Sequence, residues 1–94
     1  MPEIDVRCTT AADGWLCQVS VTGGGSESRH SVTFTRPDFQ RLAASGETPE
    51  SLCRRSFEFL LAREPKESIL RSFVLREIGR YFPEFEREIG KRIP

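Results

Sequence analysis

The sequence predicts an α+β domain in which a three-stranded antiparallel meander is followed by three or four short helices packed on one face of the sheet. Two patterns lead to this prediction. Up to residue 35 apolar and polar residues alternate, as in half-buried strands, whereas from residue 36 onward the apolar residues recur at helical spacing. The 94 residues suffice for one hydrophobic core, so we expect a single domain over 1–94, with strands at about 4–35 and helices at about 36–93.

Three alternating segments predict the strands, at residues 4–9, 15–22 and 30–35. Asp13 and Gly14 tolerate positive φ and predict a turn after the first strand, and residues 23–28 predict a flexible hairpin loop. The residues expected to face the core are Ile4, Val6, Cys8, Trp15, Cys17, Val19, Val21, Val32 and Phe34. Polar residues fill the opposite face, which we expect to be wet or to hold a partner.

The longest helix is predicted from Thr48 to Arg63, with Thr48 as its cap and Pro49 in its first turn. Its expected buried residues are Leu52, Cys53, Phe57, Leu60 and Leu61. A short helix capped by Thr35 should precede it, bury Phe39 and Leu42 and end at Gly46.

Two further helices are predicted after Pro65. The first covers 66–73 and buries Ile69, Leu70 and Phe73, after which Leu75, Ile78 and Tyr81 or Phe82 continue the apolar stripe. Pro83 should break the helix, and a last amphipathic helix over 84–93 should bury Phe85 and Ile89 and place Lys91 and Arg92 in its final turn.

Composition gives no sign of a membrane or of a strongly charged partner. The counts of basic and acidic residues are equal, at 14 each, so no net positive field draws the chain to nucleic acid. No apolar run reaches membrane-spanning length, and the first residues lack a secretory layout, so we expect a cytoplasmic protein. Cys8, Cys17 and Cys53 are then expected as small buried hydrophobes in a reducing compartment, although Cys8 and Cys17 could meet across a hairpin.

No catalytic, metal or cofactor signature stands out, so the sequence predicts neither an enzyme nor a cofactor. The single histidine, His30, has no ligand or acid at useful spacing and is expected at a solvent-exposed strand entry. The glycines at 23–25 lack the Gly-Lys-Ser/Thr continuation of a phosphate loop.

The run from Ser31 to Leu42, with Gly46 and then 48–57, resembles the ribbon-helix-helix DNA-binding family. In that family a polar strand precedes two helices, and two chains pair these strands into a ribbon that enters the major groove. The resemblance implies that Ser31, Thr33 and Thr35 face base edges and that backbone amides near Thr48 hold phosphate. The tail, over 63–70 and 78–85, is similar to the endings of short uncharacterised bacterial proteins, which implies no activity.

We therefore expect a non-enzymatic bacterial interaction module that binds another protein or a second copy of itself. Self-association is expected through a free edge of the third strand. A nucleic-acid-binding regulator of ribbon-helix-helix type is the alternative. The surface expected to meet a partner or nucleic acid consists of Ser31, Thr33, Thr35, Arg36, Arg41, Arg54 and Arg55.

Overall fold

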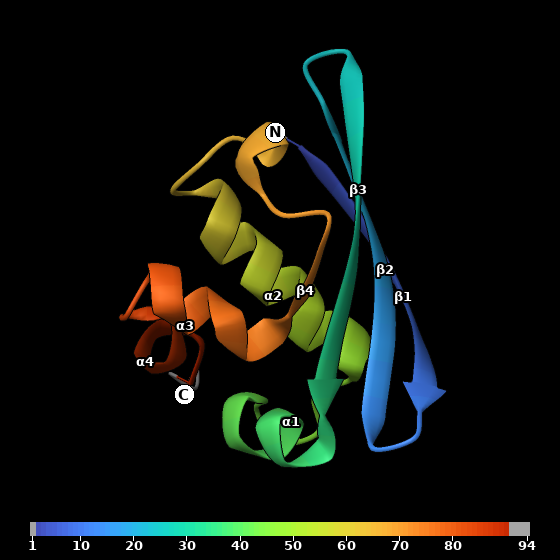
Figure 1. Ribbon diagram of the computed structural model, residues 1–94, viewed down its shortest axis with the longest axis vertical. Helices are drawn as coiled ribbons and strands as arrows, with labels where there is room; N and C mark the ends of the chain where they lie inside the picture. The colour runs from blue at the N-terminus through green and yellow to red at the C-terminus, as the bar shows by residue number, and fades with distance from the viewer. Residues whose placement is uncertain (1, 91–94) are drawn as a thin grey trace.

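The computed structural model describes residues 2–90 and shows one four-stranded sheet with the helices gathered on one side of it (Figure 1). The strands are β1 (Glu3–Ala11), β2 (Gly14–Gly23), β3 (Ser26–Thr35) and β4 (Ser72–Val74). The helices are α1 (Arg36–Leu42), α2 (Pro49–Leu61), α3 (Ile78–Tyr81) and α4 (Phe85–Gly90), with single 3-10 turns η1 (Lys66–Ser68) and η2 (Leu75–Glu77). The predicted α+β class and the antiparallel meander of β1, β2 and β3 are confirmed. No helix within residues 2–90 combines the length and the apolar character needed to cross a membrane.

The register of the meander places the predicted core residues on one face. Cys17 lies opposite Cys8 on one side and Val32 on the other, and Trp15 lies opposite Phe34. Because side chains alternate between faces along a strand, these cross-strand partners share the face that the helices cover.

The first hairpin turn lies at Ala12 and Asp13, where it was predicted, and the second hairpin turn is shorter than predicted. The loop expected over 23–28 is only the pair Gly24 and Gly25, with φ of 62° and 81°, because a two-residue turn of this type needs positive φ at both central positions and glycine supplies it without a clash. At the first turn neither Asp13 nor Gly14 has positive φ. Gly14 is required for another reason, since a Cβ there would lie 2.0 Å from the carbonyl oxygen of Phe34.

The segment predicted as a helix over 66–73 is mostly extended, and this part of the prediction is wrong. Only η1 is helical, and β4 then pairs in parallel with β3, with Val32 opposite Phe73. Ile69 and Phe73 are buried as expected, but Leu70 is 52% exposed. The four-residue spacing from Ile69 to Phe73 fits a helix as well as a strand. A strand of three residues is too short to show the alternation of apolar and polar residues.

Helix α2 is the centre of the core, as predicted. The hydroxyl of Thr48 accepts a hydrogen bond from the backbone nitrogen of Ser51 at 3.1 Å, which caps the helix. The predicted residues Leu52, Cys53, Phe57 and Leu60 are buried, and Leu61 is half-buried. Phe59, outside the predicted set, is also buried, with its ring centroid 5.9 Å from that of Phe82 and 5.1 Å from that of Phe85. Helix α2 is therefore covered by the sheet on one side and by the segment carrying α3 and α4 on another.

The remaining helix limits follow from their caps and prolines. Helix α1 begins after Thr35, as predicted, but ends at Leu42 rather than Gly46, and Phe39 is only half-buried. Helix α3 ends before Pro83 as expected, and α4 buries Phe85 and Ile89. The rest of the last predicted helix, with Lys91, Arg92 and Ile93, lies outside the described residues.

The cysteine prediction is wrong for two of the three residues. Cys8 and Cys17 form a disulfide with their Cα atoms 4.0 Å apart, because the register of β1 and β2 places them directly opposite each other. Cys53 is the free, fully buried thiol that was expected, and its burial raises its pKa to about 12. That thiol is therefore protonated and unreactive at neutral pH.

Candidate protein-docking groove

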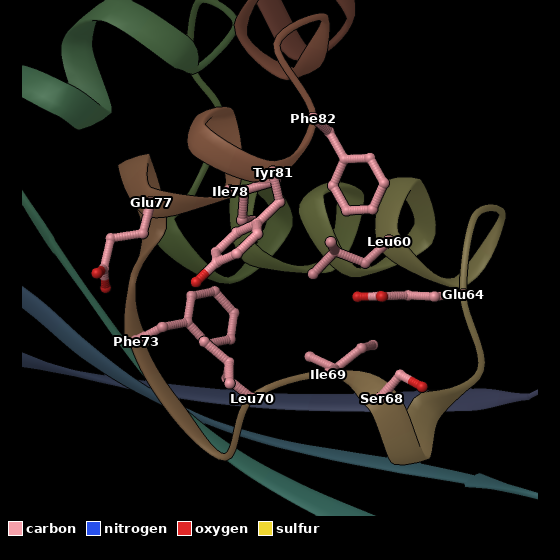
Figure 2. Close-up of a pocket in the computed structure, with 10 residues that line it drawn as sticks. All are labelled: Leu60, Glu64, Ser68, Ile69, Leu70, Phe73, Glu77, Ile78, Tyr81 and Phe82. Atoms are coloured by element: carbon pink, nitrogen blue, oxygen red, sulfur yellow. The ribbon is translucent and has the colours of Figure 1, made fainter.

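An apolar groove of about 330 Å³ lies between the C-terminal end of α2 and the segment that runs from η1 to α3 (Figure 2). Its lining combines buried aliphatic and aromatic residues with two glutamates and one serine. The lining residues are Leu60, Glu64, Ser68, Ile69, Leu70, Phe73, Glu77, Ile78, Tyr81 and Phe82. We call this surface the α2–α3 groove.

The chain path explains why the groove exists. Helix α2 ends as the backbone nitrogens of Arg63 and Glu64 donate to the carbonyl of Leu60, and Pro65 then turns the chain back toward the sheet. Because the returning segment is extended rather than helical, it covers α2 only in part. Ile69, on this segment, forms a wall of the groove beside Leu60 in Figure 2.

Both large hydrophobic side chains that residues 2–90 expose line this one groove. Leu70 is 52% exposed and Tyr81 is 68% exposed. Single exposed hydrophobic residues are ordinary, but two beside a shared apolar hollow form a patch of the kind that marks an interaction site. The helical prediction for 66–73 concealed this patch by placing Leu70 in the core.

The rim of the groove is charged. Figure 2 shows Glu77 and Glu64 at opposite ends of the groove. The carboxylate of Glu77 accepts a hydrogen bond from the backbone nitrogen of Val74 at 2.8 Å and so stabilises the start of η2. Within residues 2–90 the side chains of Glu64, Arg71 and Arg80 make no hydrogen bond or ion pair, and the two arginines directly neighbour Leu70 and Tyr81 in sequence. Among the residues that line the groove, Glu64 is therefore the carboxylate without a partner inside residues 2–90.

A buried histidine holds one side of this rim in place, and the prediction of an exposed His30 is wrong. His30 is 3% exposed because it shares the inward parity of Val32 and Phe34. Its Nδ1 donates to the carbonyl oxygen of Leu70 at 2.8 Å, and its Nε2 lies 2.8 Å from the hydroxyl oxygen of Ser28. His30 therefore ties β3 to the residue whose side chain forms the rim.

The three predicted strand residues share the open face of the sheet, away from the helices, but differ in their contacts. Ser31 donates to the side-chain oxygen of Gln18 at 3.0 Å, and Thr33 is exposed. Thr35 is half-buried and its hydroxyl accepts from the backbone nitrogen of Asp38 at 3.2 Å, so it serves as the cap of α1.

The four predicted arginines are all engaged within the chain. The guanidinium of Arg36 lies 5.0 Å from the ring centroid of Trp15, and Arg54 donates to the carbonyl oxygen of Ile4. Arg41 pairs with Asp38 at 2.7 Å and Glu86 at 2.9 Å, and Arg55 pairs with Glu47 at 2.7 Å. Arg41 and Arg55 are therefore already neutralised by carboxylates of their own chain.

Self-association through β3 was predicted to use a free edge of this strand, but part of that edge is occupied. Strand β4 pairs with Ser31, Val32 and Thr33, so this part of the prediction is wrong. The cause is the fourth strand, which the sequence pattern did not reveal. The outermost meander strand is β1.

Comparison with known proteins gives no match to a protein family, to a curated protein or to a solved structure. Within residues 2–90 no three His, Cys, Asp or Glu side chains are grouped so that they could hold a metal ion.

Proposed function

We propose that this chain is a non-enzymatic interaction module that binds a protein through the α2–α3 groove. The observation that carries the proposal is that both exposed large hydrophobic side chains of the described residues, Leu70 and Tyr81, line the same apolar hollow. Aromatic and aliphatic residues around a pocket, with a charged rim, are the usual composition of a protein-binding centre. The bacterial origin and cytoplasmic location expected from the sequence stay predictions.

The energetics suit a modest, reversible affinity. Leu70 and Tyr81 are the exposed apolar side chains that a partner would cover, and complete burial of a large apolar side chain contributes about 2 kcal/mol. Much of the groove wall, including Ile69 and Ile78, is already buried, so a partner gains less from covering it. Since association also costs translational and side-chain entropy, we expect binding in the micromolar rather than the nanomolar range.

Site-specific photo-cross-linking in cells tests the proposal. A photoreactive phenylalanine analogue replaces Tyr81 at the groove, and in a matched control it replaces Thr22 on the open face of the sheet, where the side chain is also exposed. We expect discrete protein adducts from position 81, lost when Leu70→Lys is added, and none from position 22. Identical adduct patterns at the two positions, or no adduct at position 81, would refute the proposal.

Nucleic-acid binding of the ribbon-helix-helix type is the alternative that the sequence raised. A ribbon needs β3 to pair with β3 of a second chain, but here β2 and β4 flank β3. The neutral net charge also removes the phosphate attraction on which such binding depends. A fluorescence polarisation titration with mixed DNA fragments at low salt tests this alternative, and saturable binding that Thr33→Ala abolishes would favour it over the protein-docking proposal.

A further inference from the structure

We propose that the occupant of the α2–α3 groove is a short peptide segment of another protein, in which a lysine or arginine lies among apolar side chains and pairs with Glu64. This inference rests on the proposed function and names the chemistry of its partner. Two observations carry it, namely the direction of the Glu64 side chain and the composition of the groove lining.

The carboxylate of Glu64 points into the groove. Figure 2 shows this side chain extending from the loop after α2 toward the hollow between Leu60 and Ile69. The residue is half-buried, and its side chain makes no hydrogen bond or ion pair within residues 2–90. The second acid of the lining, Glu77, differs because its carboxylate already accepts from a backbone nitrogen. Glu64 is thus the charged group that an occupant of the groove would meet.

The basic residues nearest to Glu64 in sequence are engaged elsewhere. Arg63 pairs with Glu84 at 3.1 Å, and Lys66 pairs with Glu67 at 3.0 Å. Among the described residues that line the groove there is no lysine, arginine or histidine. The charge of the groove lining is therefore negative, and a positive charge of the partner would complement it.

Covering the groove makes this carboxylate decisive for the choice of partner. While the groove is open, water reaches the half-buried side chain of Glu64, but a partner that covers Leu70 and Tyr81 displaces that water. A carboxylate that loses water without gaining a cation or a hydrogen-bond donor opposes binding. A lysine or arginine at this point removes the penalty and adds charge-assisted hydrogen bonds. Glu64 therefore favours basic over neutral apolar partners and disfavours acidic ones.

The size of the groove favours a short segment. Its volume of about 330 Å³ is near the lower end of the range of roughly 300–1,000 Å³ that is usual for pockets enclosing small ligands. Such a hollow takes a few side chains, which one short segment can supply. The aliphatic wall formed by Leu60 and Ile69 suits the apolar side chains that flank the basic residue.

Selection from a phage-displayed library of random dodecapeptides on the full chain tests the inference. We expect wild type to enrich peptides in which a lysine or arginine lies next to apolar residues. Glu64→Lys should instead enrich peptides with an aspartate or glutamate among apolar residues. Asp5→Lys, the same charge reversal at a side chain that is 71% exposed on the open sheet face, should retain the wild-type preference.

Fluorescence polarisation with the most enriched peptide then measures the contact itself. Glu64→Gln in the protein, or replacement of the basic residue of the peptide by alanine, should each raise the dissociation constant about tenfold. Both changes together should raise it little further, because they remove the same contact. Leu70→Ser should also weaken binding, which shows that the peptide occupies the groove.

The other outcomes overturn the inference and separate it from the proposed function. Peptides that depend on Leu70 but show no preference for a basic residue, or the same preference on Glu64→Lys as on wild type, would refute the role of Glu64 and leave the groove as a docking site. If no peptide depends on Leu70 although position 81 gives protein adducts in cells, a short segment is not the occupant and the proposed function stands. Failure of both experiments would refute both.

Discussion

Acidification tests the ion pair between Glu47 and Arg55, because the carboxylate of Glu47 accepts hydrogen bonds from three different residues. Both oxygens of Glu47 accept from Arg55, each at 2.7 Å, and they accept further hydrogen bonds from Ser51 at 2.7 Å and the backbone nitrogen of Ala44 at 2.9 Å. Arg55, in the middle of α2, also donates to the carbonyl oxygen of Ile89 at 2.8 Å, so the pair links α2 and the residues just before it to α4.

The structure sets the size and the sign of the effect. Burial alone would raise the pKa of Glu47, but the hydrogen bonds from Arg55, Ser51 and Ala44 outweigh burial and lower the pKa from 4.5 to about 2. This difference corresponds to on the order of 3 kcal/mol of unfolding free energy. Because the unfolded chain binds the proton first as the pH falls, this stability is complete well above pH 4.5 and is lost as the pH falls toward 2.

Urea unfolding followed by Trp15 fluorescence measures the effect at about pH 6.5 and about pH 2.5. Wild type should lose about 2 to 3 kcal/mol more than Glu47→Gln does over this interval, because the glutamine has no proton to gain. Glu3→Gln, which removes an exposed carboxylate, controls for the change in net charge. Equal pH dependence in wild type and Glu47→Gln would refute the reasoning.

Three further predictions concern stability, each measured as a change in the urea midpoint or melting temperature. Gly14→Ala should cost about 2 to 4 kcal/mol, because its Cβ would lie 2.0 Å from a backbone carbonyl oxygen, whereas Gly79→Ala meets no atom within 4 Å and should stabilise α3 by up to about 1 kcal/mol; equal effects would contradict this. Thr48→Ala should cost about 1 kcal/mol through loss of the α2 cap, and no cost would show that the cap is replaced by water. Reduction of the Cys8–Cys17 disulfide, with its sequence separation of 9, should cost about 2 to 3 kcal/mol, and an unchanged midpoint would contradict the loop-entropy argument.

The parts of the fold that the sequence predicts are those in which local pattern and tertiary packing agree. Residues 4–35 alternate clearly enough to predict the strands and the face on which each side chain lies, and Thr48 with Pro49 marks the start of α2. The same parity rule, applied to His30, would have placed it beside Val32 in the core. The exposed position was predicted instead because His30 has no acid or metal ligand at useful spacing in the sequence.

The groove was not predictable in the same way, since it depends on a strand of only three residues. The spacing of Ile69 and Phe73 fits a helix equally well, and only pairing with β3, distant in sequence, selects the extended form. Leu70 is thereby turned outward and the groove is formed. The disulfide likewise depends on the exact cross-strand register, which the alternation of apolar and polar residues does not determine.

Methyl NMR spectra recorded during a titration with the protein captured by cross-linking at position 81 test the central claim most directly, because they report which surface meets that partner. On addition of the partner, we expect shifts in the methyl signals of Leu70, Ile69 and Ile78 around the groove and none in those of Leu16 on the open sheet face. Shifts confined to Leu16 or to residues of β1, with the groove methyls unchanged, would contradict the account.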